Sequence, residues 1–175
     1  DEGDILLQSE LPVHPGEHAP SLFHRLVEAG LPLLGKTLSG LAEGVLNPRP
    51  QDHDMSTYAP IIIRQDGDPD PEVPASMMEG LVRGFDPWPG VWLSRNGTRL
   101  RIRKAHAVAG AHHRSPAGTV LVLEEDGLHL ACGEGTVLAM TVVQPDGKRQ
   151  MTAADAVNGR HLEVGDVLQA VGSLD

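Results

Sequence analysis

The sequence predicts an α+β chain that is mainly β, with a small closed β-barrel in its second half. Short apolar stretches separated by Gly-containing turns follow one another through residues 91–171, a pattern typical of a barrel rather than of a sandwich. The first half instead spaces its apolar residues as helices do and then becomes rich in Pro and Asp. Aromatic residues make up only 3% of the 175 residues, so Leu, Val, Ile and Ala must build the core.

The charge is distributed unevenly along the chain. The formal net charge is −10, yet residues 1–82 carry 14 acidic and 4 basic side chains, whereas residues 83–175 carry 10 of each. Salt screens a surface field within about 8 Å at physiological ionic strength. A basic face in the second half can therefore act independently of the acidic first half.

Cysteine content and hydropathy bear on the compartment. Cys132 is the only cysteine, which excludes an internal disulfide and favours a reducing compartment. No apolar run approaches the roughly 20 residues that a membrane-spanning helix needs, and no signal sequence is recognisable. The chain begins on charged residues without an initiator Met. We therefore expect no membrane partner, and we expect a truncated or cleaved product.

The first half is predicted to contain one strand, two helices and a linker. Residues 5–7 form a short apolar run that predicts a strand. Helical spacing begins at residue 20 and indicates one helix ending at Gly30 and a second helix beginning at Pro32. The Pro- and Asp-rich stretch after Gly44 is predicted to be a long linker that can include a short strand at 61–64.

Two histidines in the first half stand at a spacing that can bind zinc. His14 and His18 are four residues apart, which brings two imidazoles together only on a helix. Pro15 and Gly16 lie between them and disfavour a helix there. We therefore predict no metal site.

A hairpin with a row of arginines opens the barrel. Asn96-Gly97 separates two apolar stretches and tolerates the positive φ angles of a two-residue hairpin turn. Leu100 and Ile102 point to one face of the second strand. The other face carries Arg99, Arg101 and Arg103. Their spacing of about 6.5 to 7 Å is close to a phosphate repeat, so this face either binds a nucleic-acid backbone or is a solvated edge.

The remaining elements follow from turn and capping signals. A helix is predicted at 76–84, with Ser76 and Glu79 as a capping box, and a second at 153–158, capped by Thr152 with Asp155. Asp146-Gly147 predicts a turn that presents Lys148 and Arg149. Strands are predicted at 119–123, 128–132, 137–143 and 167–171.

Four motifs resemble one known family. DILLQ near the start, STYAP at 56–60, FDPWPG at 85–90 and QPDGKRQMTAADAVNG at 144–159 occur in the order and spacing of the C-terminal portion of methionyl-tRNA formyltransferases. The resemblance covers essentially the whole chain. It implies that residues 1–54 are the strand-plus-helices tail of a Rossmann-like catalytic domain, residues 55–72 a linker, and residues 73–175 a C-terminal OB-like barrel of the oligonucleotide-binding type.

The resemblance also implies an activity. The family transfers a formyl group from 10-formyltetrahydrofolate, without a metal, to the α-amine of methionine on initiator tRNA in translation initiation. Donors must stabilise the developing oxyanion, and a carboxylate must tune a histidine and help to move protons. The family uses an Asn, a His and an Asp for this purpose.

Only the aspartate can be matched in this chain. Residues 1–6, DEGDIL, align with a DTGDIL pattern and make Asp1 the catalytic carboxylate. If they are instead a shortened form of a fuller DEGLDTGDIL pattern, the catalytic position is deleted, and Asp1 is then only a terminal residue. The Asn and the His have no counterpart, because His14 is followed by Pro15 and then Gly16 where Ser is expected. We therefore expect this chain alone to be inactive.

The C-terminal domain of the family helps to hold the tRNA. By resemblance, this role falls to Arg99, Arg101, Arg103, Lys148 and Arg149. Lys148 and Arg149 are alternatively plain solvated turn residues. Phe85, Trp88 and Trp92 cluster where the hairpin begins, and we expect them to pack the helix at 76–84 against the barrel. Without a row of stacking aromatics, the double-stranded acceptor arm is the favoured target.

The resemblance further implies a cytoplasmic enzyme, or an organellar matrix enzyme in a eukaryote, that is monomeric when intact. Two other functions remain open. One is a sister formyltransferase, of the sugar-nucleotide or formyltetrahydrofolate hydrolase type, against which the motif at 144–159 speaks. The other is a non-catalytic RNA-binding module. Coding sequence upstream, with or without the catalytic Asn and His, distinguishes the enzyme from the module.

Overall fold

A computed structural model describes residues 2–174, which fall into two compact units, Asp1–Ile61 and Ile62–Asp175. The first unit is dominated by one helix, α1 (Ala19–Glu43). The predicted break into two helices is wrong, because the helix continues through both Gly30 and Pro32. A proline inside a helix removes one backbone hydrogen bond, and the helix here continues on either side of that loss. The helix ends at Gly44, whose φ of 68° is left-handed.

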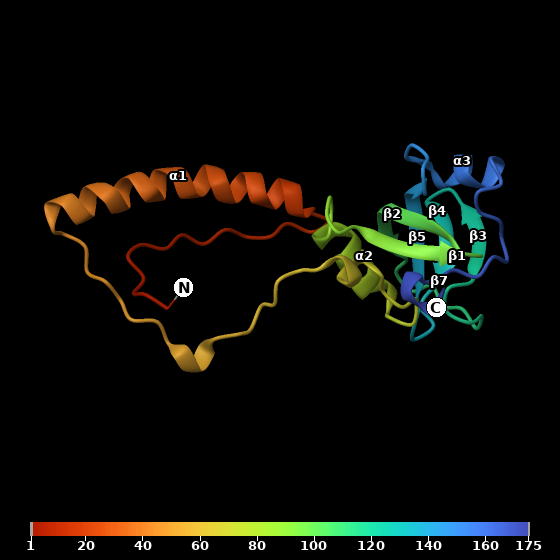
Figure 1. Cartoon of the computed structure of the whole chain (residues 1–175), viewed down its shortest axis with the longest axis horizontal. Coiled ribbons are helices and arrows are strands. Elements are labelled where there is room, and N and C mark those ends of the chain that lie inside the picture. Colours follow the sequence, from red (N-terminus) through yellow and green to blue (C-terminus); the bar gives the residue numbers. More distant parts are fainter. Residues whose placement is uncertain (1, 175) are drawn as a thin grey trace. The chain divides into compact units, whose positions relative to one another are not determined.

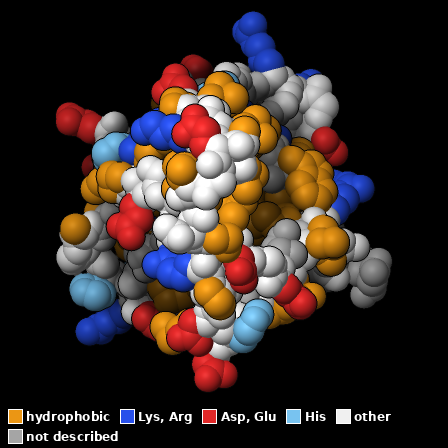
Figure 2. Space-filling view, turned by 90° about the vertical axis from the view of Figure 1, so that its left-hand side faces the viewer, with side chains coloured by type: hydrophobic (Ala, Val, Ile, Leu, Met, Phe, Trp, Pro, Cys, Tyr) orange, Lys and Arg blue, Asp and Glu red, His pale blue; other side chains and the backbone are white. Residues whose placement is uncertain are grey.

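The rest of the first unit is mostly irregular. The predicted strand at 5–7 is reduced to a single bridge, in which Ile5 and Arg49 exchange backbone hydrogen bonds of 2.8 and 3.0 Å. A 3₁₀ turn, η1 (His53–Met55), follows. Gly40 is the only buried residue of α1, and several of its apolar side chains are exposed: Phe23, Leu26, Val27, Leu31, Leu34, Leu38 and Leu41. Hydrophobic side chains are visible at the surface among acidic and basic ones (Figure 2).

The second unit is built on an antiparallel sheet curved into a half-barrel (Figure 1). Its strands are β1 (Val91–Arg95), β2 (Thr98–Ala107), β3 (Val120–Glu124), β4 (Gly127–Ala131), β5 (Val137–Pro145), β6 (Met151–Thr152) and β7 (Gln169–Ala170). The strand order is β3-β4-β5-β2-β1-β7, and β6 pairs with β5. The strand predicted at 167–171 is shorter than expected, since β7 includes only residues 169 and 170. β3 and β7 are the two edge strands of the sheet.

Backbone hydrogen bonds connect the β3 edge to the segment that precedes β7. The amide of Val120 donates to the carbonyl of Asp166, and that of Leu168 donates to Gly118, both at 2.8 Å. These bonds hold the two ends of the half-barrel together without forming a regular strand pair.

The hairpin is confirmed in detail. Asn96 and Gly97 have φ angles of 49° and 81°, as the predicted turn requires. The register pairs Leu93 with Leu100, and both side chains are buried. Trp92 pairs with Arg101 on the opposite face. The alternation of aliphatic and arginine side chains in β2 is thus the alternation of core and outer face.

Helix α2 (Ala75–Gly84) packs on one side of the half-barrel, and its Met78 and Val82 are buried in the core. The predicted capping box is wrong: Pro74 is the N-cap, and no side chain caps the helix. Glu79 instead reaches the sheet, where its carboxylate accepts a 2.9 Å hydrogen bond from the amide of Ala107. This contact joins α2 to the end of β2.

Helix α3 (Ala153–Asn158) begins as predicted, since the hydroxyl of Thr152 accepts a 3.0 Å hydrogen bond from the amide of Asp155. The predicted strand at 61–64 is wrong, because a 3₁₀ turn, η2 (Arg64–Gly67), begins inside that range. The chain's described part ends in η3 (Val171–Leu174). No helix among residues 2–174 is both long enough and apolar enough to cross a bilayer.

Candidate nucleic-acid interface

The residues predicted for tRNA binding lie on β2 and on the turn after β5. Asp1, the predicted catalytic carboxylate, lies outside the described residues. The other predicted residues are five basic side chains: Arg99, Arg101, Arg103, Lys148 and Arg149. The amide of Asp146 donates a 2.9 Å hydrogen bond to the carbonyl of Arg99, which holds the turn of Lys148 and Arg149 beside the start of β2.

The three arginines of β2 share the outer face but are largely covered. The exposed fractions of the Arg99, Arg101 and Arg103 side chains are 22%, 14% and 25%. Burial lowers the pKa of the Arg101 guanidinium; the nearby charge of Arg103 lowers it further, and Asp86 opposes both effects. The row is thus a half-buried layer and not a freely solvated cationic ridge.

Two carboxylates face this row. Asp68 lies 3.7 Å from Arg99, and Asp86 lies 3.8 Å from Arg101 and 3.4 Å from Arg103. These separations are those of ion pairs and not of short hydrogen bonds. Two negative charges therefore offset part of the positive charge of the three arginines.

An indole and a backbone carbonyl complete the surroundings of the row. The guanidinium carbons of Arg99 and Arg101 lie 4.6 and 5.7 Å from the centre of the Trp92 ring, within the range of cation–π attraction. Arg101 also donates a hydrogen bond to the carbonyl of Pro87. The Trp92 indole N–H donates to the carbonyl of Pro89 at 3.0 Å, so the arginines and the indole both hold the loop at 85–90.

Of the other two aromatic residues near the hairpin, Phe85 packs inside and Trp88 is exposed. Phe85 packs against the buried core, as expected. Trp88 is 59% exposed, so the expectation that it packs the helix against the barrel is wrong. Pro87 is exposed as well, whereas Pro89 and Gly90, which directly precede β1, are buried.

Lys148 and Arg149 are exposed on their turn. The backbone forms the turn, with the amide of Lys148 donating to the carbonyl of Pro145 at 3.0 Å and the amide group of Gln144 donating to the carbonyl of Lys148 at 2.9 Å. Neither cationic side chain forms an ion pair with residues 2–174. They are therefore the accessible members of the predicted set.

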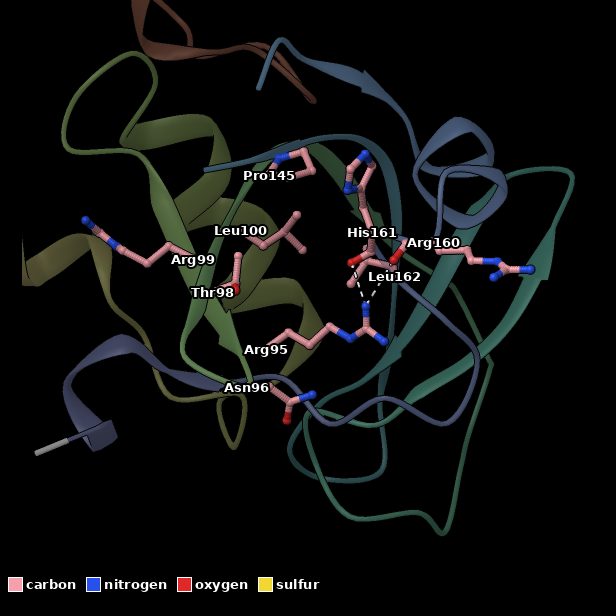
Figure 3. Close-up of a pocket in the computed structure, with 9 residues that line it drawn as sticks. All are labelled: Arg95, Asn96, Thr98, Arg99, Leu100, Pro145, Arg160, His161 and Leu162. Carbon is pink, nitrogen blue, oxygen red and sulfur yellow. Dashed lines mark hydrogen bonds between the residues drawn. The ribbon is translucent and has the colours of Figure 1, made fainter. Parts of the chain in front are cut away.

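A hollow of about 370 Å³ lies next to the hairpin turn and includes residues that the sequence patterns did not single out (Figure 3). Arg95 crosses it and donates hydrogen bonds of 3.3 and 3.0 Å to the carbonyls of Arg160 and His161. The side chains of Arg99 and Arg160 point away from it on opposite sides (Figure 3). The guanidinium groups of the three arginines that line the hollow do not point to a common centre, as they would in a site that binds an anion.

One aspartate and two histidines form a separate cluster of polar side chains on the sheet. Asp126, in the β3–β4 turn, lies 2.8 Å from His129 and 3.4 Å from His106. The hydrogen bond to His129 lowers the pKa of the Asp126 carboxyl. No group of three or more metal-ligating side chains that could hold an ion occurs among residues 2–174.

Cys132 is buried, with 1% of its surface exposed, as predicted. Burial raises the pKa of its thiol to about 12. The thiol is therefore not placed for nucleophilic chemistry.

Comparison with solved structures shows a shared fold. HypX from Aquifex aeolicus, solved in complex with tetrahydrofolic acid, aligns with a TM-score of 0.64 over 93% of this chain and 28% of its own, at 16% sequence identity. At this level of identity the likeness concerns the fold alone.

Comparison of sequences gives closer relatives. A methionyl-tRNA formyltransferase of Halalkalibacterium halodurans is 39% identical over 96% of this chain and 53% of its own length. One of Bacillus subtilis is 34% identical over 96% of this chain and 53% of its own length. The chain thus spans about half the length of these curated relatives.

A family model provides the assignment. The model described as formyl transferase, C-terminal domain, matches residues 70–161, which make up 92 of the 175 residues. The match contains the hairpin, the arginine row, the loop at 85–90 and α3. We conclude that this chain belongs to the formyl transferase family, whose C-terminal domain it contains.

Proposed function

We propose that the chain is part of a methionyl-tRNA formyltransferase. Such an enzyme transfers the formyl group of 10-formyltetrahydrofolate to the α-amine of methionyl initiator tRNA. The observation that carries the proposal is the similarity to enzymes of that name over nearly the whole chain, at 34 to 39% identity. The reading of residues 1–54 as the end of the catalytic domain, and of residues 73–175 as an OB-like tRNA-binding domain, belongs to the same proposal, as does a cytoplasmic, monomeric parent enzyme.

The tRNA-binding role is assigned to the outer face of β2 and to the turn after β5. Lys148 and Arg149 contribute first, because they are exposed and have no ion-pair partner among the described residues. Arg99, Arg101 and Arg103 belong to the same predicted set, but their charge is partly offset by Asp68 and Asp86. Contacts of this type hold phosphates and fix orientation without reading bases.

Salt dependence of tRNA binding tests how many of these cations take part. Each neutralised phosphate contributes about −0.7 to −0.9 to the slope of log K against log salt concentration. All five cations together predict a slope of about −3.5 to −4.5, and Lys148 and Arg149 alone predict about −1.4 to −1.8. We expect Lys148→Ala with Arg149→Ala to reduce the magnitude of the slope by about 1.4 to 1.8.

A matched control removes a cation from another part of the surface. Arg114→Ala changes an exposed arginine of the loop after β2 and should leave the slope unchanged. A slope that is the same in the wild-type chain and in the Lys148→Ala, Arg149→Ala variant would show that the turn does not contact tRNA.

The chain alone is proposed to be inactive. The family's catalytic Asn and His have no counterpart among the 175 residues, so most of the folate pocket and of the oxyanion donors must come from elsewhere. A formylation assay on charged initiator tRNA should show no turnover with residues 1–175. Turnover by a longer protein that contains this chain and the Asn and His would support the parent activity.

A further inference from the structure

The outer face of the hairpin is covered by two segments that are separate in sequence. One is the loop at 85–90, between α2 and β1. The other is the end of the linker at 62–68, which contains η2. The loop contacts Arg101 and the linker end faces Arg99, and the two segments also meet each other at Gly67 and Gly90.

The inner contact is between Arg101 and the loop. Gly90 has a φ of +78°, which favours glycine, and a methyl group on it would lie 2.5 Å from Nε of Arg101, so the guanidinium would have to move if residue 90 had a side chain. Arg101 also donates to the carbonyl of Pro87 and faces Asp86 at 3.8 Å. The loop is thus held at its start by a charge, in its middle by a hydrogen bond and at its end by close packing.

The outer contact is between the loop and the linker end. Gly67 is buried, and a methyl group on it would overlap the carbonyl oxygen of Gly90 and lie 3.1 Å from Cβ of Pro89. The next residue, Asp68, faces Arg99 at 3.7 Å. Within η2, the carboxylate of Asp66 accepts a 2.7 Å hydrogen bond from the amide of Ile63, which closes the turn on itself.

We propose that Arg99 and Arg101 are positioning residues that clasp the linker end at 62–68 to the barrel through the loop at 85–90. By "arginine clasp" we mean Arg99, Arg101, Asp68, Gly67 and Gly90. The clasp fixes the point at which the linker leaves the second unit. In the parent enzyme, and so resting on the proposed function, it sets how the barrel presents bound tRNA to the catalytic domain.

A substitution that changes packing without changing charge can distinguish the clasp from a row of arginines that binds phosphates. Gly67→Ala alters no charge and touches no arginine, yet it forces Gly67 away from Gly90. Gly80→Ala is the matched control, because a methyl group on Gly80, in α2, meets no atom within 4 Å. Arg101→Lys keeps the positive charge but removes Nη2, the atom that donates to Pro87 and faces Asp86, together with the guanidinium that packs on Gly90.

The first test is limited trypsin digestion of the 175-residue chain, followed by mass spectrometry at the Arg64–Gln65 bond. Local opening of η2 should raise the cleavage rate at least about fivefold in Gly67→Ala and in Arg101→Lys, with unchanged cleavage in Gly80→Ala. The urea midpoint of unfolding, measured on the same samples, separates local opening from global destabilisation. Unchanged cleavage in both test variants would overturn the clasp.

The second test is tRNA binding and formylation. Gly67→Ala should leave the salt slope of tRNA binding by the chain unchanged, and should lower kcat/KM of the parent enzyme for charged initiator tRNA at least about tenfold. If Gly67→Ala instead leaves kcat/KM of the parent enzyme unchanged, the clasp does not set how the barrel presents tRNA and is overturned. The digestion test does not depend on tRNA, so its failure is distinct from a failure of the proposed function.

Discussion

The guanidinium of Arg99 lies 4.6 Å from the centre of the Trp92 ring, on the outer face of the hairpin where both side chains are half-buried. Trp92 also donates its indole N–H to the carbonyl of Pro89 at 3.0 Å. The indole therefore connects the arginine row to the loop at 85–90. A single aromatic residue here stabilises both a cation and a backbone turn.

Trp92→Leu should lower the free energy of unfolding by about 2 kcal/mol, from one lost hydrogen bond and the lost cation–π contacts. Urea unfolding followed by circular dichroism measures the change without relying on tryptophan emission. Trp88→Leu is the matched control: Trp88 is 59% exposed, and the change should stay within about 0.5 kcal/mol. Equal effects of the two substitutions would contradict the role given to Trp92.

The ion pair of Arg95 and Asp166 predicts a measurable coupling. Nε of Arg95 lies 2.7 Å from Oδ2 of Asp166, and the side chains are 22% and 14% exposed. Arg95 also donates to the carbonyls of Arg160 and His161, so it joins the hairpin to the segment after α3. Asp166→Asn should cost about 1 to 3 kcal/mol, because a half-buried guanidinium loses its counter-charge.

A double-mutant cycle with Arg95→Met isolates this pair. We expect the double variant to be more stable than the sum of the single losses predicts, by about 1 kcal/mol or more. Strict additivity of the two losses in urea unfolding would mean that the pair contributes nothing of its own.

Local signals in the sequence were enough to predict much of the second unit. The Asn96-Gly97 turn, the alternation along β2 and the Thr152 cap each depend on residues that are adjacent or three apart, and the structure confirms all three. In the first unit, Gly30 and Pro32 are also strong local signals, yet α1 continues through them. Gly and Pro cost a helix interior about 1 and about 3 kcal/mol, but these costs act at single residues, whereas helix formation is cooperative along all 25 residues of α1.

The surroundings of the arginine row could not be predicted in the same way. The pattern placed Arg99, Arg101 and Arg103 on one face, but Asp68 and Asp86 reach them from the segments at 62–68 and 85–90, which precede the hairpin. Such contacts depend on the path of the chain between elements, which periodicity does not describe.

Glu17 predicts a pH dependence in the first unit. Hydrogen bonds from Arg25, at 2.6 Å, and from the amide of His14, at 3.1 Å, lower the pKa of its carboxyl from 4.5 to about 2. Because the folded value is below the unfolded value, the contribution of Glu17 to stability is present above pH 4.5 and is lost as the pH falls towards 2. A carboxyl ¹³C titration by NMR should give a midpoint near 2.

Arg25→Ala supplies the control for this titration. Without the guanidinium, the midpoint of Glu17 should move up towards its ordinary value. Ser21→Ala should have a smaller effect, since the Ser21 hydroxyl donates a longer hydrogen bond of 3.1 Å to the same carboxylate. A midpoint that stays in place in Arg25→Ala would show that the ion pair does not form in solution.

Cys132 predicts slow thiol chemistry in the folded chain. It is 1% exposed, and burial raises the pKa of its thiol to about 12, so almost no thiolate is present at pH 8. We expect iodoacetamide to label the folded chain at least about a thousandfold more slowly than an ordinary thiol of pKa about 8.5. The same chain in concentrated urea is the internal control and should react at the ordinary rate, because unfolding removes the burial that raises the pKa. Rapid labelling of the folded chain, with an unchanged circular dichroism spectrum, would place Cys132 at the surface and contradict the packing at the end of β4.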